Sequence, residues 1–476
     1  MTLNTPHRLL INGEWIETSS SFDVLDPATG NVLSHVSAAE AAEIDAAVTA
    51  AHNAFSPWAD TAPRVRAEVL RKAFEIMTAE IDECARLISL ENGKALKDAL
   101  AEARYAAEFF RWFSEEAVRT PGDFRKAPAG DKMIITDHKP IGVALLITPW
   151  NFPAAMATRK FGPALAAGCT TILKPPAETP LTALWVADVL QRAGAPAGVV
   201  NVVLTKSSGP AVSQMLNDKR VSTLSFTGST FVGKMLLEQT AKRALRSSME
   251  LGGNAPFLVL EGSNVDEAVK GAMIAKMRNG GAACTAANRF YVHESLVKEF
   301  STKFSSALAS LNVGPGVEPT TDLGAMVSQK EADKIRELVE KARSEGGSVQ
   351  ETTSIPEKGA FVAPTIVTDI EHGSILTQEE VFGPVAPIVS VSSTDEAVRM
   401  ANDTDYGLIS YVYAKDVGTA LSVGRRMESG MVAVNRGLAS DPAAPFGGMK
   451  ESGLGREGGF HGIHEFLEPQ YLAVDL

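Results

Sequence analysis

The chain has 476 residues, of which 45% are hydrophobic and 21% are charged, and it carries a net charge of −12 at pH 7. A chain of this length exceeds what one compact core accommodates, so we expect two or three lobes, and the composition excludes long disordered stretches. The acidic balance disfavours general binding to nucleic acid or to anionic membranes.

The cysteines and the first residues indicate the compartment. Cys84, Cys169 and Cys284 are widely scattered, without metal or redox spacing, so we expect neither a disulfide framework nor a metal site. Residues 1–6 lack the basic and then apolar order of a signal peptide, and the apolar run 141–147 is too short to cross a bilayer. We therefore predict a cytoplasmic protein.

In the first half of the chain, the pattern of apolar residues changes at Pro140. Residues 62–118 show apolar positions at helical spacing with charges between them, which predicts helices. After Pro140, short β-branched runs alternate with helical stretches, which is typical of a parallel, doubly wound sheet. The predicted strands are 141–148, 170–174, 199–204 and 223–227. Ligands of such sheets bind at the carboxyl ends of the strands, where Trp150, Lys174 and Gly228 stand.

The second half alternates in the same way and predicts a separate α/β domain from Phe257 to about Arg436. Its predicted elements are strands 257–260, 289–293, 387–391 and 409–413 and helices 265–279 and 329–344. Two further segments, 121–137 and 466–476, have strand-like texture without helices of their own. Because such segments commonly pair with the sheet edge of another subunit, we expect a homo-oligomer.

Two glycine-bearing segments carry candidate chemistry. Glu250 precedes Leu-Gly-Gly-Asn, and Cys284 follows Gly-Gly-Ala-Ala. A thiol is the most nucleophilic side chain near neutral pH, and a carboxylate within reach activates either the thiol or the water that attacks an acyl-enzyme. On spacing alone, the alternative is a small buried cysteine and a charge at a helix end.

A third segment, residues 226–233 (Phe-Thr-Gly-Ser-Thr-Phe-Val-Gly), favours a phosphate site. Its glycines fall at a strand-to-helix turn, where backbone N–H groups can donate to a pyrophosphate. The alternative is a tight turn that binds no ligand. Lys174 is positioned to meet ribose or phosphate oxygens, Glu380 to hold ribose hydroxyls, and Phe382 to pack on a nicotinamide ring. Together these residues indicate one dinucleotide site.

The order of these segments resembles the aldehyde dehydrogenase superfamily. The resemblance rests on 148–153, Lys174, 226–229, 250–253, Cys284, 380–384 and 445–450, and it extends over nearly the whole chain. It implies an α/β fold with a Rossmann-type NAD(P)-binding domain (1–120 and 140–249), an α/β catalytic domain (250–436) and a β oligomerisation flap (121–139 and 457–476). It also implies a homodimer or homotetramer.

The resemblance assigns roles to individual residues. Cys284 is the nucleophile, Glu250 activates the deacylating water, and Asn151 donates to the oxyanion together with the N–H of Cys284. Lys160 and Glu457 match a pair that relays a proton from the base, with a plain ion pair as the alternative. No metal is required, because hydride loss drives the collapse of the first adduct. The matching cofactor positions are Thr148, Trp150, Lys174, Ala177, Gly228, Ser229, Val232, Leu251, Glu380 and Phe382.

Within the superfamily, the chain most resembles succinate-semialdehyde dehydrogenases, through residues 151–160, 276–279 and 453–458. In that family two arginines and a serine hold the distal carboxylate of the substrate, and the matching residues are Arg159, Arg278 and Ser440. Arg436 adds a cation near the expected mouth of the pocket. This cation favours a substrate with a sulfonate group; the alternative is that the Arg436 side chain faces outward. The predicted substrate is a short anionic aldehyde, succinate semialdehyde first, with glutarate semialdehyde or sulfolactaldehyde as alternatives.

Cofactor choice depends on the residue that meets the adenosine 2′ position. NAD-preferring relatives often place a glutamate three residues after the strand-end lysine, where this chain has Ala177, with Glu178 one place later. We therefore predict that both NAD and NADP are used, with a lean to NADP. A CoA-acylating enzyme and a non-catalytic member of the fold are the rival interpretations, and the presence of Glu250 with Cys284 and Asn151 argues against both.

Overall fold

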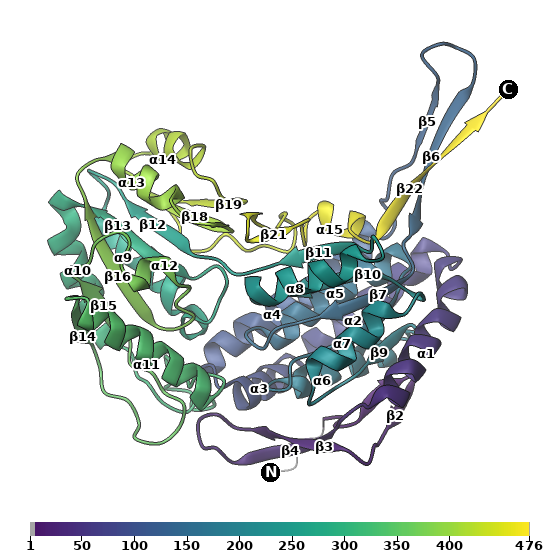
Figure 1. Cartoon of the computed structure of the whole chain (residues 1–476), viewed down its shortest axis with the longest axis horizontal. Helices are drawn as coiled ribbons and strands as arrows, with labels where there is room; N and C mark the ends of the chain where they lie inside the picture. The colour runs from purple at the N-terminus through teal and green to yellow at the C-terminus, as the bar shows by residue number, and fades with distance from the viewer. Residues whose placement is uncertain (1–4, 476) are drawn as a thin grey trace.

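The computed structural model describes residues 5–475, which form two α/β lobes and a projecting three-stranded sheet (Figure 1). One lobe contains an eight-stranded sheet with the order β2-β1-β9-β8-β7-β10-β11-β21, and the other a seven-stranded sheet with the order β14-β15-β16-β13-β12-β18-β19. Between residues 5 and 475, no helix is both long and apolar enough to cross a membrane.

The first lobe is a parallel sheet with antiparallel strands added at its two edges. Its strands are β1 (Leu9–Ile11), β2 (Glu14–Ile16), β7 (Val143–Ile147), β8 (Thr170–Lys174), β9 (Val200–Val202), β10 (Val221–Thr227), β11 (Arg246–Glu250) and β21 (Gly453–Leu454). Its helices are α1 (Ala41–Ala59), α2 (Pro63–Ala79), α3 (Ile81–Asn92), α4 (Leu96–Glu116), α5 (Pro153–Ala167), α6 (Pro180–Arg192), α7 (Ser208–Asn217) and α8 (Thr230–Ala241). The predicted helical region 62–118 is therefore three helices.

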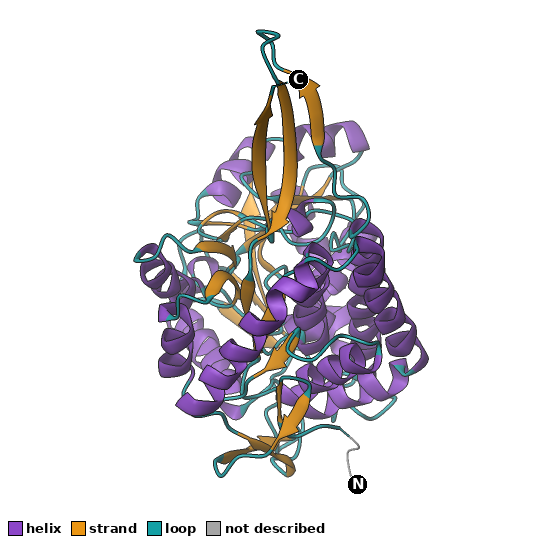
Figure 2. Cartoon of the chain, turned by 90° about the vertical axis from the view of Figure 1, so that its right-hand side faces the viewer, coloured by secondary structure: helices purple, strands orange, loops and turns teal. Residues whose placement is uncertain are grey.

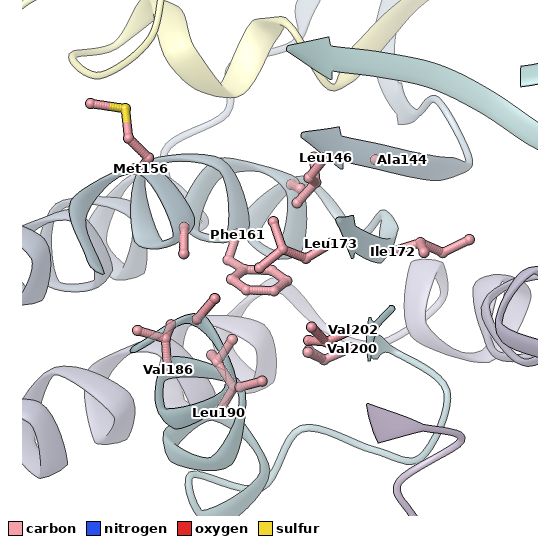
Figure 3. Close-up of a cluster of buried hydrophobic side chains, with 14 of the residues drawn as sticks. Ala144, Leu146, Met156, Phe161, Ile172, Leu173, Val186, Leu190, Val200 and Val202 are labelled. Atoms are coloured by element: carbon pink, nitrogen blue, oxygen red, sulfur yellow. The ribbon is translucent and has the colours of Figure 1, made fainter. Parts of the chain in front are cut away.

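Helix α5 lies at the centre of this lobe, and every one of its residues is buried. It begins with Pro153 at its first position and ends at Gly168, whose φ of +100° favours glycine. Phe161 packs among side chains from the sheet and from α6, and Met156 lies on the opposite side of α5 (Figure 3). Because α5 has no solvent-facing stripe, its charged residues need partners inside the protein.

The second lobe is built around strands buried on both faces, as the sequence predicted. Its strands are β12 (Ala255–Val259), β13 (Ala287–His293), β14 (Ser348–Glu351), β15 (Thr365–Thr368), β16 (Val385–Val391), β18 (Ile409–Tyr413) and β19 (Met431–Val434). Its helices are α9 (Val265–Met277), the 3-10 helix η1 (Arg278–Gly281), α10 (Glu294–Ala309), α11 (Gln329–Ser344), α12 (Ile375–Gln378), α13 (Thr394–Asn402) and α14 (Val417–Gly424). Phe257, Phe290 and Tyr411 pack their rings together in its core.

The projecting sheet consists of β5 (Asp123–Lys126), β6 (Met133–Pro140) and β22 (Leu467–Val474), with Leu467 opposite Pro140 and Val474 opposite Met133. It stands away from the rest of the molecule (Figure 2) and exposes Phe124 and Tyr471. These strands lie in the segments 121–139 and 457–476 that the sequence assigned to a flap, of which Leu476 lies outside the described residues. The remaining elements are β3 (Ser21–Leu25), β4 (Val32–Ser37), β17 (Tyr406–Gly407), β20 (Met449–Lys450) and α15 (His461–His464).

The predicted boundary between residues 249 and 250 divides a strand. Glu250 is the last residue of β11 in the first sheet, where it pairs with Thr227 on one side and with Gly453 on the other. Residues 437–456, to which no domain was assigned, therefore return through β21 to the first lobe. This return brings the C-terminal segment beside Glu250, where it helps to form the site.

Candidate active site

The loop before β13 carries Cys284. Asn279, Gly280 and Gly281 adopt left-handed φ values of +57°, +62° and +75°, so the chain reverses sharply between α9 and β13. A side chain at Gly281 would collide with the carbonyl of Gly383, which explains why glycine stands there. Cys284 emerges from this loop half-buried and lines a cavity of about 500 Å³.

Glu250 is held beside this loop by close backbone approaches. A Cβ atom at Gly253 would lie 2.5 Å from the carbonyl oxygen of Cys284, and one at Gly447 would lie 2.9 Å from Oε1 of Glu250. The Glu250 carboxyl group is buried, and neither of its oxygens has a hydrogen-bond partner in the part of the chain that the structure describes. An unpaired buried carboxyl is costly and is typical of a functional site.

The electrostatics of this pair explain how its protons are held. Burial raises the pKa of Glu250 well above its usual range and the charge of Glu457 raises it further, while Arg159 and Lys160 oppose the rise. Burial also raises the pKa of the Cys284 thiol to about 12; here Arg159 lowers the pKa and Glu250 raises it. In the free protein both groups therefore retain their protons more strongly than they would in water.

Asn151 joins the nucleophile loop through a set of hydrogen bonds. Its side-chain Nδ2 donates to the carbonyl of Ala282 at 3.1 Å. The carbonyl of Asn151 accepts from Nζ of Lys94 at 2.7 Å and from Nδ2 of Asn279 at 2.9 Å. Nδ2 of Asn279 also donates to the carbonyl of Ala282 at 2.8 Å, and the N–H of Asn279 donates to Asp98 at 2.9 Å. Asn279 thus connects the Asn151 backbone with the Cys284 loop.

Lys94, before α4, and Glu102, on α4, hold Asn151 and the first turn of α5 in place through hydrogen bonds. Lys94 forms a buried ion pair with Glu102, whose Oε1 accepts from the N–H groups of Ala154 at 2.9 Å and Ala155 at 3.3 Å. A carboxylate at these free N–H groups stabilises the first turn of α5, immediately after Asn151. Lys94 is therefore both neutralised by Glu102 and directed at the Asn151 carbonyl.

Six of the predicted cofactor residues line the same cavity as Asn151 and Cys284. They are Trp150, Gly228, Ser229, Leu251, Glu380 and Phe382. The hydroxyl of Ser229 caps α8 by accepting from the N–H of Val232 at 3.4 Å, and the rings of Trp150 and Phe382 meet edge to face at 5.3 Å. Oε1 of Glu380 accepts from the N–H of Gly253 at 3.1 Å, and desolvation raises the pKa of Glu380 to about 7.

Sequence reasoning missed several residues that line this cavity: Met156, Thr230, Phe231, Glu331, Lys334 and Tyr406. Thr230 and Phe231 directly follow the Gly228-Ser229 pair, so their place in the motif is a signal that could have found them. Glu331 and Lys334 lie on α11 of the second lobe and carry no motif. Only the approach of the two lobes brings these two residues to the cavity.

Four predicted cofactor residues lie outside this lining. Thr148 and Lys174 stand at the carboxyl ends of the adjacent strands β7 and β8, where the N–H of Thr148 donates to the carbonyl of Lys174 at 3.4 Å. Burial lowers the pKa of Lys174 to about 8, with Glu178 opposing the change, and within residues 5–475 its amine forms no ion pair. Ala177 and Val232 are half-buried.

The predicted substrate residues separate into two groups. Arg159 is buried, with its Nε 2.8 Å from Oε2 of Glu457 and its guanidinium carbon 3.7 Å from the ring centroid of Phe446. Oε1 of Glu457 accepts from Nζ of Lys160 at 2.6 Å, so one carboxylate pairs with two neighbouring cations. Arg278 is half-buried, and its charge, like that of Arg159, lowers the pKa of Cys284. Arg159 and Arg278 thus share the electrostatic environment of the Cys284 thiol.

Ser440 and Arg436 belong to the second group. Ser440 is half-buried and Arg436 is exposed. Among the described residues, neither makes a hydrogen bond to Cys284, Arg159 or Arg278. Arg436 acts on the pKa of Tyr413. Burial raises this pKa to about 12, and the charge of Arg436 opposes the rise.

The model of the aldehyde dehydrogenase family matches residues 15–472. The chain belongs to the aldehyde dehydrogenase family. This family uses NAD or NADP as its cofactor, and the predicted class of enzyme, an NAD(P)-dependent aldehyde dehydrogenase, is confirmed.

Individual relatives cover nearly the whole chain. A succinate-semialdehyde dehydrogenase of Paenarthrobacter nicotinovorans is 47% identical over 93% of this chain and 99% of its own length. A glutarate-semialdehyde dehydrogenase of Pseudomonas putida is 44% identical over 98% of this chain and 97% of its own length. The crystal structure of an NADP-dependent enzyme of E. coli is 42% identical, covers 99% of this chain and 98% of that chain, and superimposes with a TM-score of 0.97. The predicted fold class is therefore confirmed.

Proposed function

We propose that this aldehyde dehydrogenase oxidises a short aldehyde with an anionic far end, succinate semialdehyde first, to the corresponding acid. The observation that carries the proposal is the pair of guanidinium groups, Arg159 and Arg278, that act on the Cys284 thiol inside an acidic protein. A guanidinium group binds a carboxylate through two parallel hydrogen bonds and so orients it. Relatives named for succinate and glutarate semialdehydes support this substrate class.

The cavity suits a dinucleotide. It has the volume of a ligand pocket, about 500 Å³, and combines the capped N-terminus of α8, the half-buried Glu380 carboxyl and the Phe382 ring. We assign the pyrophosphate to the N-terminus of α8, the ribose hydroxyls to Glu380 and the nicotinamide to Phe382. When bound, NAD(P) supplies a hydride acceptor.

Lys174 and Ala177 favour NADP over NAD. Lys174 is a buried amine without an ion-pair partner among the described residues, and Ala177 offers no carboxylate to repel a 2′-phosphate. The E. coli structure of an NADP-dependent enzyme agrees with this choice. We expect both cofactors to be used, with the lower KM for NADP.

The residues of this chain then perform acyl transfer in two stages. The Cys284 thiol gives its proton to solvent in the cavity as its sulfur bonds to the aldehyde carbon, and the side-chain amide of Asn151 with the N–H of Cys284 stabilises the oxyanion. Loss of hydride leaves a thioester on Cys284. Glu250 then takes a proton from water as that water attacks the thioester and the carbon–sulfur bond breaks, which releases the acid and the Cys284 thiolate; the thiolate regains a proton from solvent. Lys160 and Glu457, in contact at 2.6 Å, conduct the proton onward.

Oligomerisation and compartment complete the proposal. We assign the projecting sheet of β5, β6 and β22 to subunit contacts of a homodimer or homotetramer in the cytoplasm, because it exposes apolar side chains such as Phe124 and Tyr471. Light scattering of the purified enzyme, beside a variant that lacks residues 467–476, distinguishes this assembly from a monomer.

A substrate panel tests the proposed function. kcat/KM is measured with succinate semialdehyde, glutarate semialdehyde, sulfolactaldehyde and the neutral hexanal, each with NAD and NADP, beside Cys284→Ala as a blank. We expect the preferred anionic aldehyde to exceed hexanal by about 100-fold or more. Equal values for hexanal and the anionic aldehydes would remove the proposal.

A further inference from the structure

The hydroxyl of Tyr105 is a buried hydrogen-bond donor without an acceptor among the described residues. Tyr105 lies on α4, and its hydroxyl oxygen is inaccessible to solvent and has no hydrogen-bond partner in residues 5–475. A buried hydroxyl in a folded protein ordinarily finds a partner, because leaving it unpaired costs the full energy of its desolvation. The mechanism above does not use this group.

Arg159 and Arg278 both act electrostatically on the Tyr105 hydroxyl. Its ring meets the ring of Phe109 edge to face at 4.8 Å, and the guanidinium carbon of Arg159 lies 5.7 Å from the centroid of the same Phe109 ring. Burial raises the pKa of the Tyr105 hydroxyl, and Arg159 and then Arg278 lower it. These are the two arginines that act on Cys284, so the hydroxyl, the arginines and the nucleophile share one environment.

Several donors in this environment have no strong acceptor. Nε of Arg159 faces Glu457, but its Nη2 has no hydrogen-bond partner among the described residues, and its Nη1 meets only the sulfur of Met156, at 4.0 Å. Arg278 reaches the hydroxyl of Thr285 at 3.5 Å, which is a weak contact. The nearby carboxylate of Glu457 is already shared by Arg159 and Lys160. A ligand that brings anionic oxygens would supply the missing acceptors.

Met156 connects this cluster to the reaction cavity. It lines the cavity together with Cys284, and its sulfur lies against the far end of the Arg159 guanidinium. Figure 3 shows its side chain on the side of α5 opposite Phe161. A thioether side chain has three rotatable bonds and adapts easily. Met156 therefore lies between the cavity and the Arg159 guanidinium.

We propose that Tyr105 is a specificity-determining residue that donates its hydroxyl hydrogen to the anionic end of the substrate, beside Arg159 and Arg278. This inference rests on the proposed function, since it names a further contact for the same anionic aldehyde. The Tyr105 hydroxyl differs from the arginines because it is a neutral donor, and replacing tyrosine by phenylalanine removes only its oxygen and hydrogen. In the free protein this oxygen has no hydrogen-bond partner among the described residues.

The first test is Tyr105→Phe with succinate semialdehyde and hexanal as paired substrates. We expect KM for succinate semialdehyde to rise about 10- to 100-fold, because a hydrogen bond to a charged group is lost, while kcat changes little. Both constants for hexanal stay at their wild-type values. An unchanged KM for succinate semialdehyde would overturn the inference and leave the proposed function standing, whereas a wild-type enzyme without preference for the anionic aldehyde would remove both.

The second test measures thermal unfolding, which requires no turnover. Tyr105→Phe keeps or raises the unfolding midpoint of the free protein, because it removes an unpaired hydroxyl, and it reduces the upward shift that succinate produces in the wild type. Tyr291→Phe is the matched control: the Tyr291 hydroxyl lies 2.9 Å from Nδ1 of His372, so its loss lowers the midpoint and leaves KM unchanged. A lowered midpoint for Tyr105→Phe would contradict the inference, since it would assign the hydroxyl a structural partner.

Discussion

The cofactor end and the anion end of this site are built in different ways. The cofactor cavity, about 500 Å³, is lined by loop and helix-terminal residues around Gly228 and Ser229, and several of its contacts come from the backbone. The anion end consists of side chains from α4, α5 and η1, with Arg159 and Lys160 fully buried and paired with Glu457. We therefore propose that one end recognises its ligand by shape and backbone groups, and the other by charges removed from water.

This difference explains how each end gains selectivity. Backbone N–H groups at a helix start donate to the oxygens of any suitable phosphate, so we expect the cofactor end to tolerate related dinucleotides. Nη2 of Arg159 has no hydrogen-bond partner among the described residues, so we expect an anionic aldehyde to supply an acceptor that a neutral aldehyde lacks. We therefore expect changes at the anion end to alter which aldehyde is used, and changes at the cofactor end to alter only how well the cofactor is held.

The largest expected effect is that of Arg278→Met. Arg278 has no ion-pair partner among the described residues, so its removal leaves no carboxylate uncompensated. We expect kcat/KM for succinate semialdehyde to fall about 100-fold or more, and kcat/KM for hexanal and KM for the cofactor to change little. Steady-state kinetics with both aldehydes checks this, and a parallel loss for hexanal would show that Arg278 supports the nucleophile rather than the anion.

A smaller effect is expected from Asn279→Ala, which acts on both ends through the Cys284 loop. Loss of its bonds to the carbonyls of Asn151 and Ala282 disturbs the oxyanion donors, so kcat falls about 10- to 100-fold with little change in KM for either substrate. Asn264→Ala is the control, because Asn264 only caps α9 by accepting from the N–H of Glu267 at 3.1 Å. The control loses stability, by about 1 kcal/mol, but retains kcat. Equal kcat values for the two variants would contradict this role.

The smallest effect is a pH dependence at the cofactor end. The pKa of Glu380 is raised to about 7, so the carboxyl is ionised above that pH and protonated below it. Ionised Glu380 accepts hydrogen bonds from ribose hydroxyls, so KM for the cofactor should rise up to about tenfold as the pH falls from about 8 to about 6. In Glu380→Gln the KM is higher at every pH and no longer follows this titration. A wild-type slope that persists in Glu380→Gln would assign the titration to another group.

The sequence allowed the cofactor end to be predicted better than the anion end. Strand β8 and helix α11 have the predicted bounds, and the loops after the strands carry glycines whose backbone demands are visible in the sequence. The contact of Arg159 with Glu457 was not predicted, because it joins α5 to the returning C-terminal segment, and no local pattern encodes that approach.

The same limit applies to α4. Its apolar spacing predicted a helix with a buried face, but the spacing does not say what that face meets. Packing against α5 turns Asp98, Glu102 and Tyr105 into neighbours of the Asn279 backbone, the first turn of α5 and the arginine cluster. A helical pattern alone would have left these three residues as ordinary solvated or core positions.

The most direct test of the account is to trap the acyl group on Cys284. Glu250→Gln retains the nucleophile and the anion end but lacks the base for the attacking water, so one turnover with NADP and succinate semialdehyde should leave a succinyl group on the peptide that contains Cys284. Mass spectrometry of the digested protein measures it. We expect a stoichiometric adduct on Cys284 in Glu250→Gln, little in the wild type, and none with Cys284→Ala in the same background. Reduced cofactor formed without any adduct on Cys284 would contradict the account.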